Sequence, residues 1–307
     1  MTIPTLDLEK FINGSENEKE VFSNQIGEAF HNIGFVCISN HGIPDNLIHE
    51  LYHSVQRFFT LPLIIKEKYE IFGLAGQRGY TSFGKEHAKG SEYPDLKEFF
   101  QYGQPHLSTL HNVEVAEITD FNNTLNKAFF SFERAGVYLL RAISRYLRLD
   151  EFYFDEKVIN GDSIIRAIHY PPITNNPNTA VRAEQHEDIN LITLLIGASA
   201  DGLQILLKDN TWMNITAGPG EIVVNVGDML QRLTNNRLKS TTHRVINPPQ
   251  NLWHTSRFSI PYFLHPKADV SLSCLTSCID LDNPKRFDDI TAGEYLHERL
   301  VEIGLKK

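Results

Sequence analysis

Two histidines and an aspartate in this 307-residue chain have the residue types and the spacing of a metal site. His186 and Asp188 are two residues apart, and side chains at that spacing on a strand point to the same face. His243, in a later apolar segment, supplies a third ligand from a distant strand. Two imidazoles and one carboxylate on one face of a ferrous ion leave positions open for oxygen and a reductant. The pattern predicts a non-haem iron(II) centre.

Other interpretations of the same residues stay open. A His-x-Asp pair is common by chance, and a chain with 13 histidines usually offers another one downstream. Glu187 falls between His186 and Asp188 on the opposite face of a strand, so we expect it to face solvent or to support the ligands. Zinc in the same three ligands would make a hydrolase, and a protein of the same fold without metal would be a binding module.

A second polar pair lies at Arg257 and Ser259, again two residues apart on an apolar strand. A guanidinium and a hydroxyl on one strand face can bind a carboxylate, and arginine can do so through two parallel hydrogen bonds. A buried arginine needs a partner, which is either a protein carboxylate or a ligand. Beside an iron site we favour the carboxylate of a ligand.

The composition is that of a globular protein, with 41% hydrophobic and 22% charged residues. A formal net charge of −9 argues against nucleic acid as a partner. The first ten residues lack a basic start followed by an apolar core, and the apolar run Leu191 to Ala198 is too short to span a bilayer. Cys37, Cys274 and Cys278 are too few and too scattered for a disulfide framework. We expect a cytoplasmic protein without membrane contact.

The first half of the chain has helical periodicity interrupted by one clear strand. Helices are expected over Glu18 to Ile33, from Asp45 towards Phe59 and over Phe121 to Leu149, with a strand at Phe35 to Ser39. Residues 73–106 contain many glycine and polar residues with little regular pattern, which is typical of a lid or a binding loop.

After Asp162 short apolar segments follow one another, separated by glycine, asparagine and proline turns. This alternation predicts an antiparallel sandwich or barrel. The expected strands are residues 163–170, 191–196, 203–206, 221–226 and 257–263. Thr291 and Glu294 form a capping box ahead of a final helix that reaches Ile303.

In this order the segments resemble the isopenicillin N synthase-like family of iron(II)- and 2-oxoglutarate-dependent dioxygenases over nearly the whole chain. The N-terminal segments are Ile3-Pro-Thr-Leu-Asp7, Gly34-Phe-Val-Cys-Ile-Ser-Asn-His-Gly-Ile-Pro44 and Arg57-Phe-Phe-Thr-Leu-Pro62. The core segments are His169-Tyr-Pro-Pro172, His186-Glu-Asp188 with Leu191-Ile-Thr-Leu-Leu195, Gly202-Leu-Gln204, Pro219-Gly-Glu-Ile-Val-Val-Asn-Val-Gly-Asp228, Leu233-Thr-Asn-Asn-Arg-Leu-Lys-Ser240, His243-Arg-Val245 and Arg257-Phe-Ser259.

The resemblance implies a mainly β protein with flanking α-helices, built on a double-stranded β-helix (jelly roll) core. It divides one compact unit into a mixed N-terminal region (residues 1–120), supporting helices (121–160), the jelly-roll core (161–270) and a C-terminal tail and helix (271–307). It also implies that Arg257 and Ser259 hold the distal carboxylate of 2-oxoglutarate, with Tyr170 nearby. Two features depart from many plant members: Ile168 replaces an asparagine, and the segment between His243 and Arg257 is longer.

The activity implied is oxidation of a small organic molecule, most simply hydroxylation, that consumes 2-oxoglutarate and O2 and releases succinate and CO2. An iron oxidase of the same family that does not use 2-oxoglutarate is the alternative, with Arg257 and Ser259 gripping the substrate's own carboxylate. The candidate substrate-binding residues are Arg78, Tyr80, Lys97, Phe99, Arg166 and Phe263. If several cations face the pocket, a carboxylate-bearing substrate is favoured. A monomer or a homodimer is expected.

Overall fold

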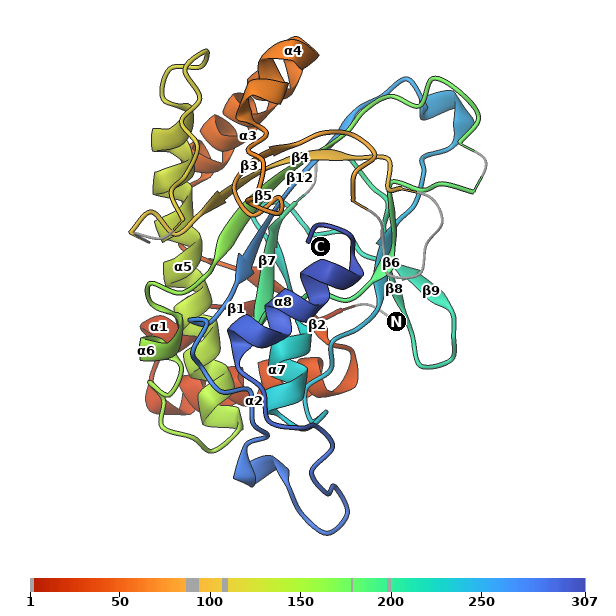
Figure 1. The fold of residues 1–307 in the computed structure, drawn as a ribbon. Helices are drawn as coiled ribbons and strands as arrows, with labels where there is room; N and C mark the ends of the chain where they lie inside the picture. Colours follow the sequence, from red (N-terminus) through yellow and green to blue (C-terminus); the bar gives the residue numbers. More distant parts are fainter. Residues whose placement is uncertain (1–2, 87–93, 107–109, 178, 198–199, 307) are drawn as a thin grey trace.

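The computed structural model describes residues 3–86, 94–106, 110–177, 179–197 and 200–306. Two sheets dominate it: an eight-stranded sheet in the order β1-β2-β10-β7-β12-β5-β4-β3, and a four-stranded sheet in the order β6-β11-β8-β9. Figure 1 shows helix α5 along one side of the large sheet and the small sheet on the other side. All strand pairs are antiparallel except β1 with β2.

The strands are short, as expected for this architecture. Their bounds are β1 Thr5–Asp7, β2 Phe35–Ser39, β3 Gly79–Thr81, β4 Glu98–Gly103, β5 Ile164–Tyr170, β6 Ala183–His186, β7 Ile192–Ile196, β8 Leu203–Leu206, β9 Trp212–Asn214, β10 Ile222–Val226, β11 His243–Val245 and β12 Arg257–Leu264. The α-helices are α1 Glu9–Ile12, α2 Glu16–Asn32, α3 Asp45–Thr60, α4 Leu63–Lys66, α5 Phe121–Tyr146, α6 Asp155–Val158, α7 Asp228–Leu233 and α8 Ala292–Glu302. Single 3-10 turns occupy Glu67–Tyr69, Gln250–Leu252 and Thr276–Cys278.

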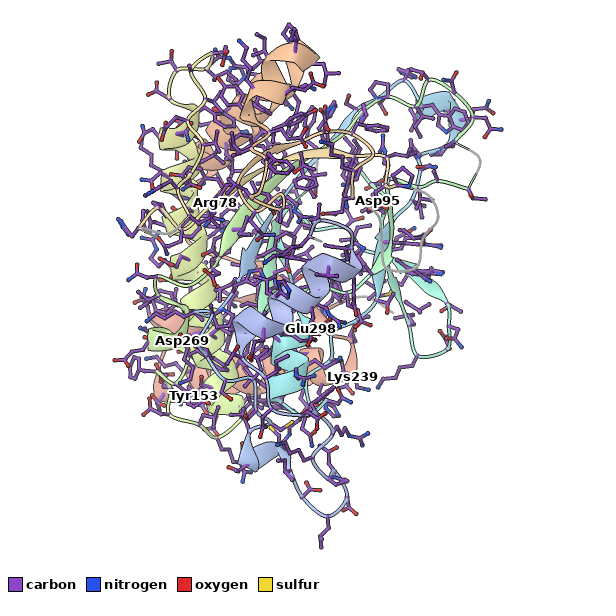
Figure 2. All side chains as sticks on the ribbon, in the orientation of Figure 1. Arg78, Asp95, Tyr153, Lys239, Asp269 and Glu298 are labelled. Atoms are coloured by element: carbon purple, nitrogen blue, oxygen red, sulfur yellow. The ribbon has the colours of Figure 1, made fainter. Side chains whose placement is uncertain are left out.

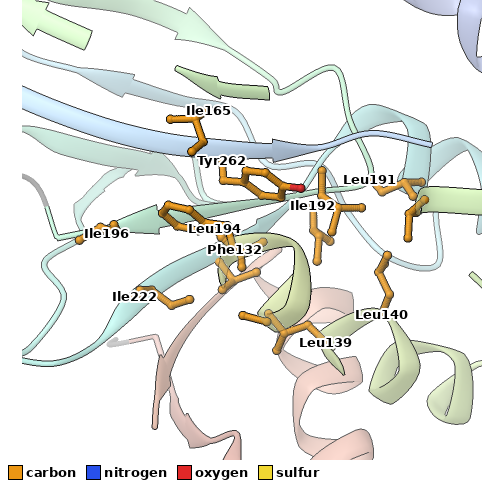
Figure 3. Close-up of a cluster of buried hydrophobic side chains, with 14 of the residues drawn as sticks. Phe132, Leu139, Leu140, Ile165, Leu191, Ile192, Leu194, Ile196, Ile222 and Tyr262 are labelled. Carbon is orange, nitrogen blue, oxygen red and sulfur yellow. The ribbon is translucent and has the colours of Figure 1, made fainter. Parts of the chain in front are cut away.

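The main core lies between the large sheet and α5. Helix α5 has an apolar face at helical spacing, and this face covers β5, β7 and β12. Phe132 of α5 stacks on Tyr262 of β12, with ring centroids 5.3 Å apart and planes within 4° (Figure 3). Because the helix buries the outer face of these strands, their inner face is left to line a cavity between the two sheets.

Strands β5 and β12 form the floor of that cavity. Tyr170 lies opposite Arg257 and Ile168 opposite Ser259. Every second residue of a strand points to the same face. The cavity-facing residues are accordingly Ile164, Arg166, Ile168 and Tyr170 on β5, and Arg257, Ser259, Pro261 and Phe263 on β12.

The structure confirms the predicted class, a mainly β protein with flanking helices and two sheets in a jelly-roll arrangement. The expected helices and strands occur within a few residues of their predicted ends. The capping box at Thr291 and Glu294 is present, and a second one at Ser15 and Glu18 begins α2. No helix in the described ranges is both long enough and apolar enough to cross a bilayer.

The expectation for residues 73–106 was wrong. Residues 73–106 are not an irregular segment throughout, because β3 and β4 pair with each other and β4 also pairs with β5. All six residues of β4 are buried, so the strand shows none of the polar–apolar alternation by which a half-exposed strand is recognised. Residues 87–93 of this stretch lie outside the described residues. Through β1 to β4, the N-terminal region adds strands to the same sheet as β5, β7, β10 and β12.

Candidate metal centre and co-substrate seat

His186, Asp188 and His243 lie together, with one ligand atom of each within 4.8 Å of the others. His243 is directly opposite His186 across the β6–β11 pair, and their ring centroids are 4.4 Å apart. Nε2 of His243 is 3.7 Å from Oδ1 of Asp188. The expectation that His186 and Asp188 share one strand was wrong, because β6 ends at His186 and Asp188 lies in the irregular segment that follows. That segment still brings the carboxylate to the two rings.

Both histidine rings are oriented by the backbone. Nδ1 of His186 bonds the carbonyl of Glu184 at 2.7 Å, and Nδ1 of His243 bonds the carbonyl of Thr241 at 3.0 Å. Each bond places a proton on Nδ1 and leaves the Nε2 lone pair for a metal, as in most histidine metal sites. Burial and the neighbouring His243 lower the pKa of His186 to about 4, so the ring is neutral at physiological pH, as a ligand must be.

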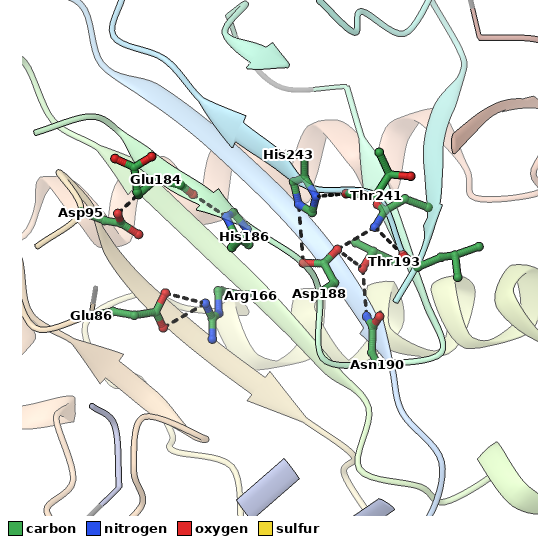
Figure 4. Close-up of polar contacts among 12 residues, drawn as sticks. Glu86, Asp95, Arg166, Glu184, His186, Asp188, Asn190, Thr193, Thr241 and His243 are labelled. Carbon is green, nitrogen blue, oxygen red and sulfur yellow. Dashed lines mark hydrogen bonds and ion pairs between the residues drawn. The ribbon is translucent and has the colours of Figure 1, made fainter. Parts of the chain in front are cut away.

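The Asp188 carboxylate is held from the large sheet (Figure 4). Its Oδ2 accepts hydrogen bonds from Thr193 Oγ1 of β7 at 2.6 Å and from Asn225 Nδ2 of β10 at 2.8 Å. Asn190 in turn donates to Thr193 Oγ1 at 2.9 Å. Burial alone would raise the pKa of Asp188, but the two histidines and these hydrogen bonds outweigh it and hold the pKa below its ordinary value. The carboxylate is therefore ionised and oriented. Two imidazoles with one carboxylate are the donor set that suits iron(II).

Arg257 has the properties of an anion seat. It is 1% exposed, its Nε donates to the carbonyl of Ala200 at 3.0 Å, and its Nη1 is buried without a hydrogen-bond partner. The guanidinium carbon is 5.1 Å from the centre of the Tyr170 ring, and Ser259 is buried on the same strand face. No ion pair between Arg257 and a carboxylate occurs among the described residues. A buried donor of this kind fits the carboxylate of a bound acid.

The metal cluster and the Arg257 seat line the same cavity, which has a volume of about 560 Å³. Of the candidate substrate-binding residues, Lys97, Arg166 and Phe263 also line this cavity. Helix α8 contributes Leu296, Leu300 and other residues to the lining.

The other three candidates, Arg78, Tyr80 and Phe99, are absent from the described lining. Tyr80 belongs to the main apolar core, and Phe99 packs beneath Arg166 with its ring centre 4.4 Å from the guanidinium carbon. The Arg78 guanidinium occupies the space where a Cβ on Gly103 would be, and Figure 2 shows Arg78 on the α5 side of the molecule. Arg78 and Tyr80 are buried in the core. Phe99 lies on the same face of β4 as Gln101, which lines the cavity, and it packs with Ile168 and Tyr170 beneath that lining.

Sequence reasoning missed the residues that support the ligands. Thr193 and Asn225 hold Asp188, and Asp95 and Glu86 pair with cavity cations. A signal was present for Thr193 and Asn225, since each is the one polar residue in an apolar strand and such a residue requires a partner. Glu86 and Asp95 carry no comparable signal, since they flank residues 87–93 in a stretch of mixed polarity.

Two protein-family models match the chain. Residues 3–121 match the N-terminal region described as non-haem dioxygenase in morphine synthesis, and residues 161–266 match the 2OG-Fe(II) oxygenase superfamily. The second match contains all three clustered ligands and both residues of the Arg257 seat.

Proteins similar over their full length bear related names. The proline hydroxylase buaE of Petromyces alliaceus is 32% identical over 98% of this chain and 99% of its own. A structure of a 2OG-Fe(II) oxygenase family protein from Caulobacter crescentus is 37% identical with a TM-score of 0.87, covering 98% of this chain and 99% of that one. A full-length Neurospora crassa protein in complex with alpha-KG (2-oxoglutarate) is 30% identical with a TM-score of 0.90, covering 97% of this chain and 95% of that one.

The family resemblance seen in the sequence is thus confirmed, together with the cofactors it implied, iron(II), 2-oxoglutarate and O2. The chain belongs to the 2OG-Fe(II) oxygenase superfamily and is a non-haem iron(II)- and 2-oxoglutarate-dependent dioxygenase.

Proposed function

We propose that His186, Asp188 and His243 hold iron(II), that Arg257, Ser259 and Tyr170 hold 2-oxoglutarate, and that the enzyme hydroxylates a small organic molecule. The observation that carries this proposal is the buried, unpartnered Nη1 of Arg257 in the same cavity as the three-ligand cluster. Bound iron(II) with 2-oxoglutarate supplies the activation of O2 that ends in succinate, CO2 and an oxidised substrate.

The residues of the chain have positioning roles. The carbonyls of Glu184 and Thr241 fix the histidine rings, and Thr193 and Asn225 fix the Asp188 carboxylate. Such partners keep ligands in one geometry and tune their basicity. This chemistry needs no side-chain nucleophile and no general base. The apolar residues of α8 would limit the access of water to the cavity.

A small-molecule substrate is supported by the cavity volume and by the relatives. The same Neurospora crassa protein has been crystallised with alpha-KG and thymine, at 30% identity and a TM-score of 0.89, and buaE is named a proline hydroxylase. We also propose that the protein acts in the cytoplasm as a monomer or a homodimer. The three cysteines are buried free thiols, which suits a reducing compartment.

Anaerobic titration tests the assignment. Iron(II) and then 2-oxoglutarate are added, and the metal-to-ligand charge-transfer absorption of the ternary complex is followed. Changing His186, Asp188 or His243 to Ala is expected to abolish iron binding. Unchanged iron affinity in all three variants would contradict the assignment of these residues as metal ligands.

The co-substrate seat is tested separately with Arg257→Ala and Arg257→Lys. Charge-assisted hydrogen bonds contribute about 1.5–3 kcal/mol, so Arg257→Ala is expected to weaken 2-oxoglutarate binding by roughly 10- to 100-fold. Lys keeps the charge but not the two-pronged geometry, so it is expected to restore part of the affinity. Unaltered 2-oxoglutarate affinity in both variants would favour an oxidase in which Arg257 binds the substrate instead.

A further inference from the structure

Beyond the co-substrate seat, the cavity is bounded by four buried charged side chains that neutralise one another. We call Glu86, Asp95, Lys97 and Arg166 the charge-balanced wall. Nζ of Lys97 is 2.6 Å from Glu86 and 2.7 Å from Asp95, and Nη1 of Arg166 is 3.1 Å from both carboxylate oxygens of Glu86. Their side chains are between 4% and 14% exposed. Two cations and two anions thus face the cavity with no net charge.

The wall lies where a second ligand would bind. Arg166 and Tyr170 are on the same face of β5, and four residues of a strand span about 13 Å. A co-substrate held at Tyr170 and Arg257 therefore leaves Arg166 free for another molecule. Figure 4 shows Glu86 and Arg166 in the same close-up as His186, and all three residues line one cavity.

The charge balance argues against an organic anion as substrate. Apart from Arg257 of the co-substrate seat, the cations in the described lining are Lys97, Arg166 and Arg299. Each of these three already has a carboxylate partner. An additional anion would be buried beside Glu86 and Asp95 without a cation of its own, and burying an unpaired charge is costly. A ligand of net charge zero avoids that cost.

The wall can still recognise polar groups. The described hydrogen bonds of Arg166 engage Nε, to Gln101 at 2.9 Å, and Nη1, while a guanidinium has five N–H donors. Glu86 beside it accepts from two cations and has further lone pairs. A donor and an acceptor are thereby presented side by side. Leu296 and Leu300 of helix α8, with Ile303 directly after it, supply a contrasting apolar surface. Arg299 and Glu302 of the same helix also line the cavity and form an ion pair with each other.

We propose that the substrate is a small molecule of net charge zero whose polar side carries a donor beside an acceptor, as in a zwitterionic amino acid or a cyclic amide, and whose other side is apolar. This inference rests on the proposed function, because it takes the cavity for the substrate site. Glu86 and Arg166 are then the residues that determine specificity.

Matched pairs of compounds test the charge rule on the full-length enzyme. L-Proline is compared with N-acetyl-L-proline, and thymine with orotate, so that each neutral or zwitterionic compound is matched with an anion that has the same ring. Succinate release above the substrate-free rate is measured, together with the thermal shift of the anaerobic protein loaded with iron(II) and 2-oxoglutarate. The panel is extended to other amino acids and cyclic amides. Net-neutral members are expected to act at concentrations at least tenfold lower than their anionic partners.

A response to L-proline or other amino acids indicates an amino-acid substrate, and a response to thymine or other cyclic amides indicates a cyclic amide. An anion that acts at an equal or lower concentration overturns the inference, and so does the absence of any response among the net-neutral compounds. Failure of the proposed function would look different, since 2-oxoglutarate alone would then produce neither a thermal shift nor slow succinate release in the wild-type protein.

A variant tests the role of the wall itself. Glu86→Gln removes one negative charge and leaves the cavity with an excess cation, so the preference for neutral over anionic compounds is expected to fall at least tenfold. Asp289→Asn is the matched control, because Asp289 forms an exposed ion pair with Lys285 at 2.6 Å and does not line the cavity. An unchanged preference in a folded Glu86→Gln protein contradicts the inference, and the wild-type panel decides the question if that variant does not fold.

Discussion

Asp95 accepts a hydrogen bond at 3.0 Å from the backbone N–H of Glu184, whose carbonyl accepts a hydrogen bond at 2.7 Å from Nδ1 of His186 (Figure 4). A residue far from the ligands in sequence thereby binds the backbone of Glu184, whose carbonyl orients one of them. Lys97 holds Asp95 in place through an ion pair of 2.7 Å. The charge-balanced wall and the metal cluster are therefore joined by continuous contacts.

The first prediction concerns this connection. Asp95→Ala is expected to weaken iron(II) affinity by about tenfold. The variant loses a bond to the backbone of Glu184, the residue that orients His186, and loss of such outer support typically costs 10- to 100-fold in metal affinity. Asp95→Asn keeps an oxygen that can accept from Glu184 and is expected to retain most of the affinity. Anaerobic competition with a chromogenic chelator measures both variants. Equal affinities for Asp95→Ala and the wild type would show that the Glu184 peptide is held without Asp95.

A second prediction concerns Asp188. Thr193→Val preserves the shape of the side chain but removes the donor at 2.6 Å, so the carboxylate loses one of the two bonds that hold it. Iron(II) affinity is expected to fall by about tenfold, with little change in 2-oxoglutarate affinity at saturating iron. The same titrations as above check this result, with Thr211→Val on an exposed turn as control. A selective loss of 2-oxoglutarate binding would instead place Thr193 in the co-substrate seat.

A third prediction concerns the stability of the protein without its co-substrate. Arg257 is a buried cation for which the described residues supply no carboxylate, so it is expected to destabilise the fold until an acid binds. Arg257→Met should raise the free energy of unfolding by about 1–3 kcal/mol in the absence of ligand. Adding 2-oxoglutarate at 100 times the wild-type Kd should stabilise the wild type by about 2.7 kcal/mol and the variant by less. Urea denaturation with and without the acid measures both effects, and a less stable ligand-free variant would contradict the prediction.

Gly103 provides a prediction about Arg78. A Cβ at position 103 would lie 1.9 Å from the Arg78 guanidinium carbon, so Gly103→Ala must displace this buried side chain. Overpacking of this kind typically costs about 1–3 kcal/mol. The midpoint of urea unfolding is expected to fall while the KM for substrate stays within twofold, because Arg78 does not line the described cavity. A large change in KM without a loss of stability would indicate that Arg78 contributes to substrate binding.

The last prediction concerns acid stability. Burial would raise the pKa of Glu86, but Arg166 and Lys97 outweigh it and lower the pKa to about 2 from 4.5. A carboxyl group with a depressed folded-state pKa stabilises the protein above its unfolded-state pKa and loses that contribution as pH falls through the folded-state value. Stability is thus expected to decline between about pH 4.5 and 2, and Glu86→Gln should flatten this decline. Thermal unfolding across this range checks it, and parallel pH profiles would refute the assignment.

The sequence predicted well whatever depends on local pattern. Helix α5 and strand β12 have strong periodicity or alternation, and both occur within a few residues of the expected bounds. His186, Asp188 and His243 could be named because metal ligands are a small set of residue types. The strand assignment of Asp188 failed because an irregular segment can bring a carboxylate to the same point as a strand can.

What the sequence could not provide were pairings over long distances. Nothing in the residue order indicates that Glu86 and Lys97 meet Arg166 on β5, because the contact depends on how the β4–β5 pair forms. The sequence offers Lys97 and Arg166 as candidate cations of the pocket, but it does not reveal the carboxylates that pair with them. Strand β4 was overlooked because complete burial removes the alternation on which recognition depends.

The ligands of the cluster are divided between the two sheets. His186 and His243 are on β6 and β11 of the small sheet, whereas Asp188 is hydrogen-bonded to β7 and β10 of the large one. An ion bound by all three is therefore a cross-link between the halves of the jelly roll. Loss of the metal should let the sheets separate locally. The rates of proteolysis and of hydrogen exchange near Asp188 should therefore rise as metal occupancy falls. Metal exchange, in turn, should be limited by how often the two sheets part.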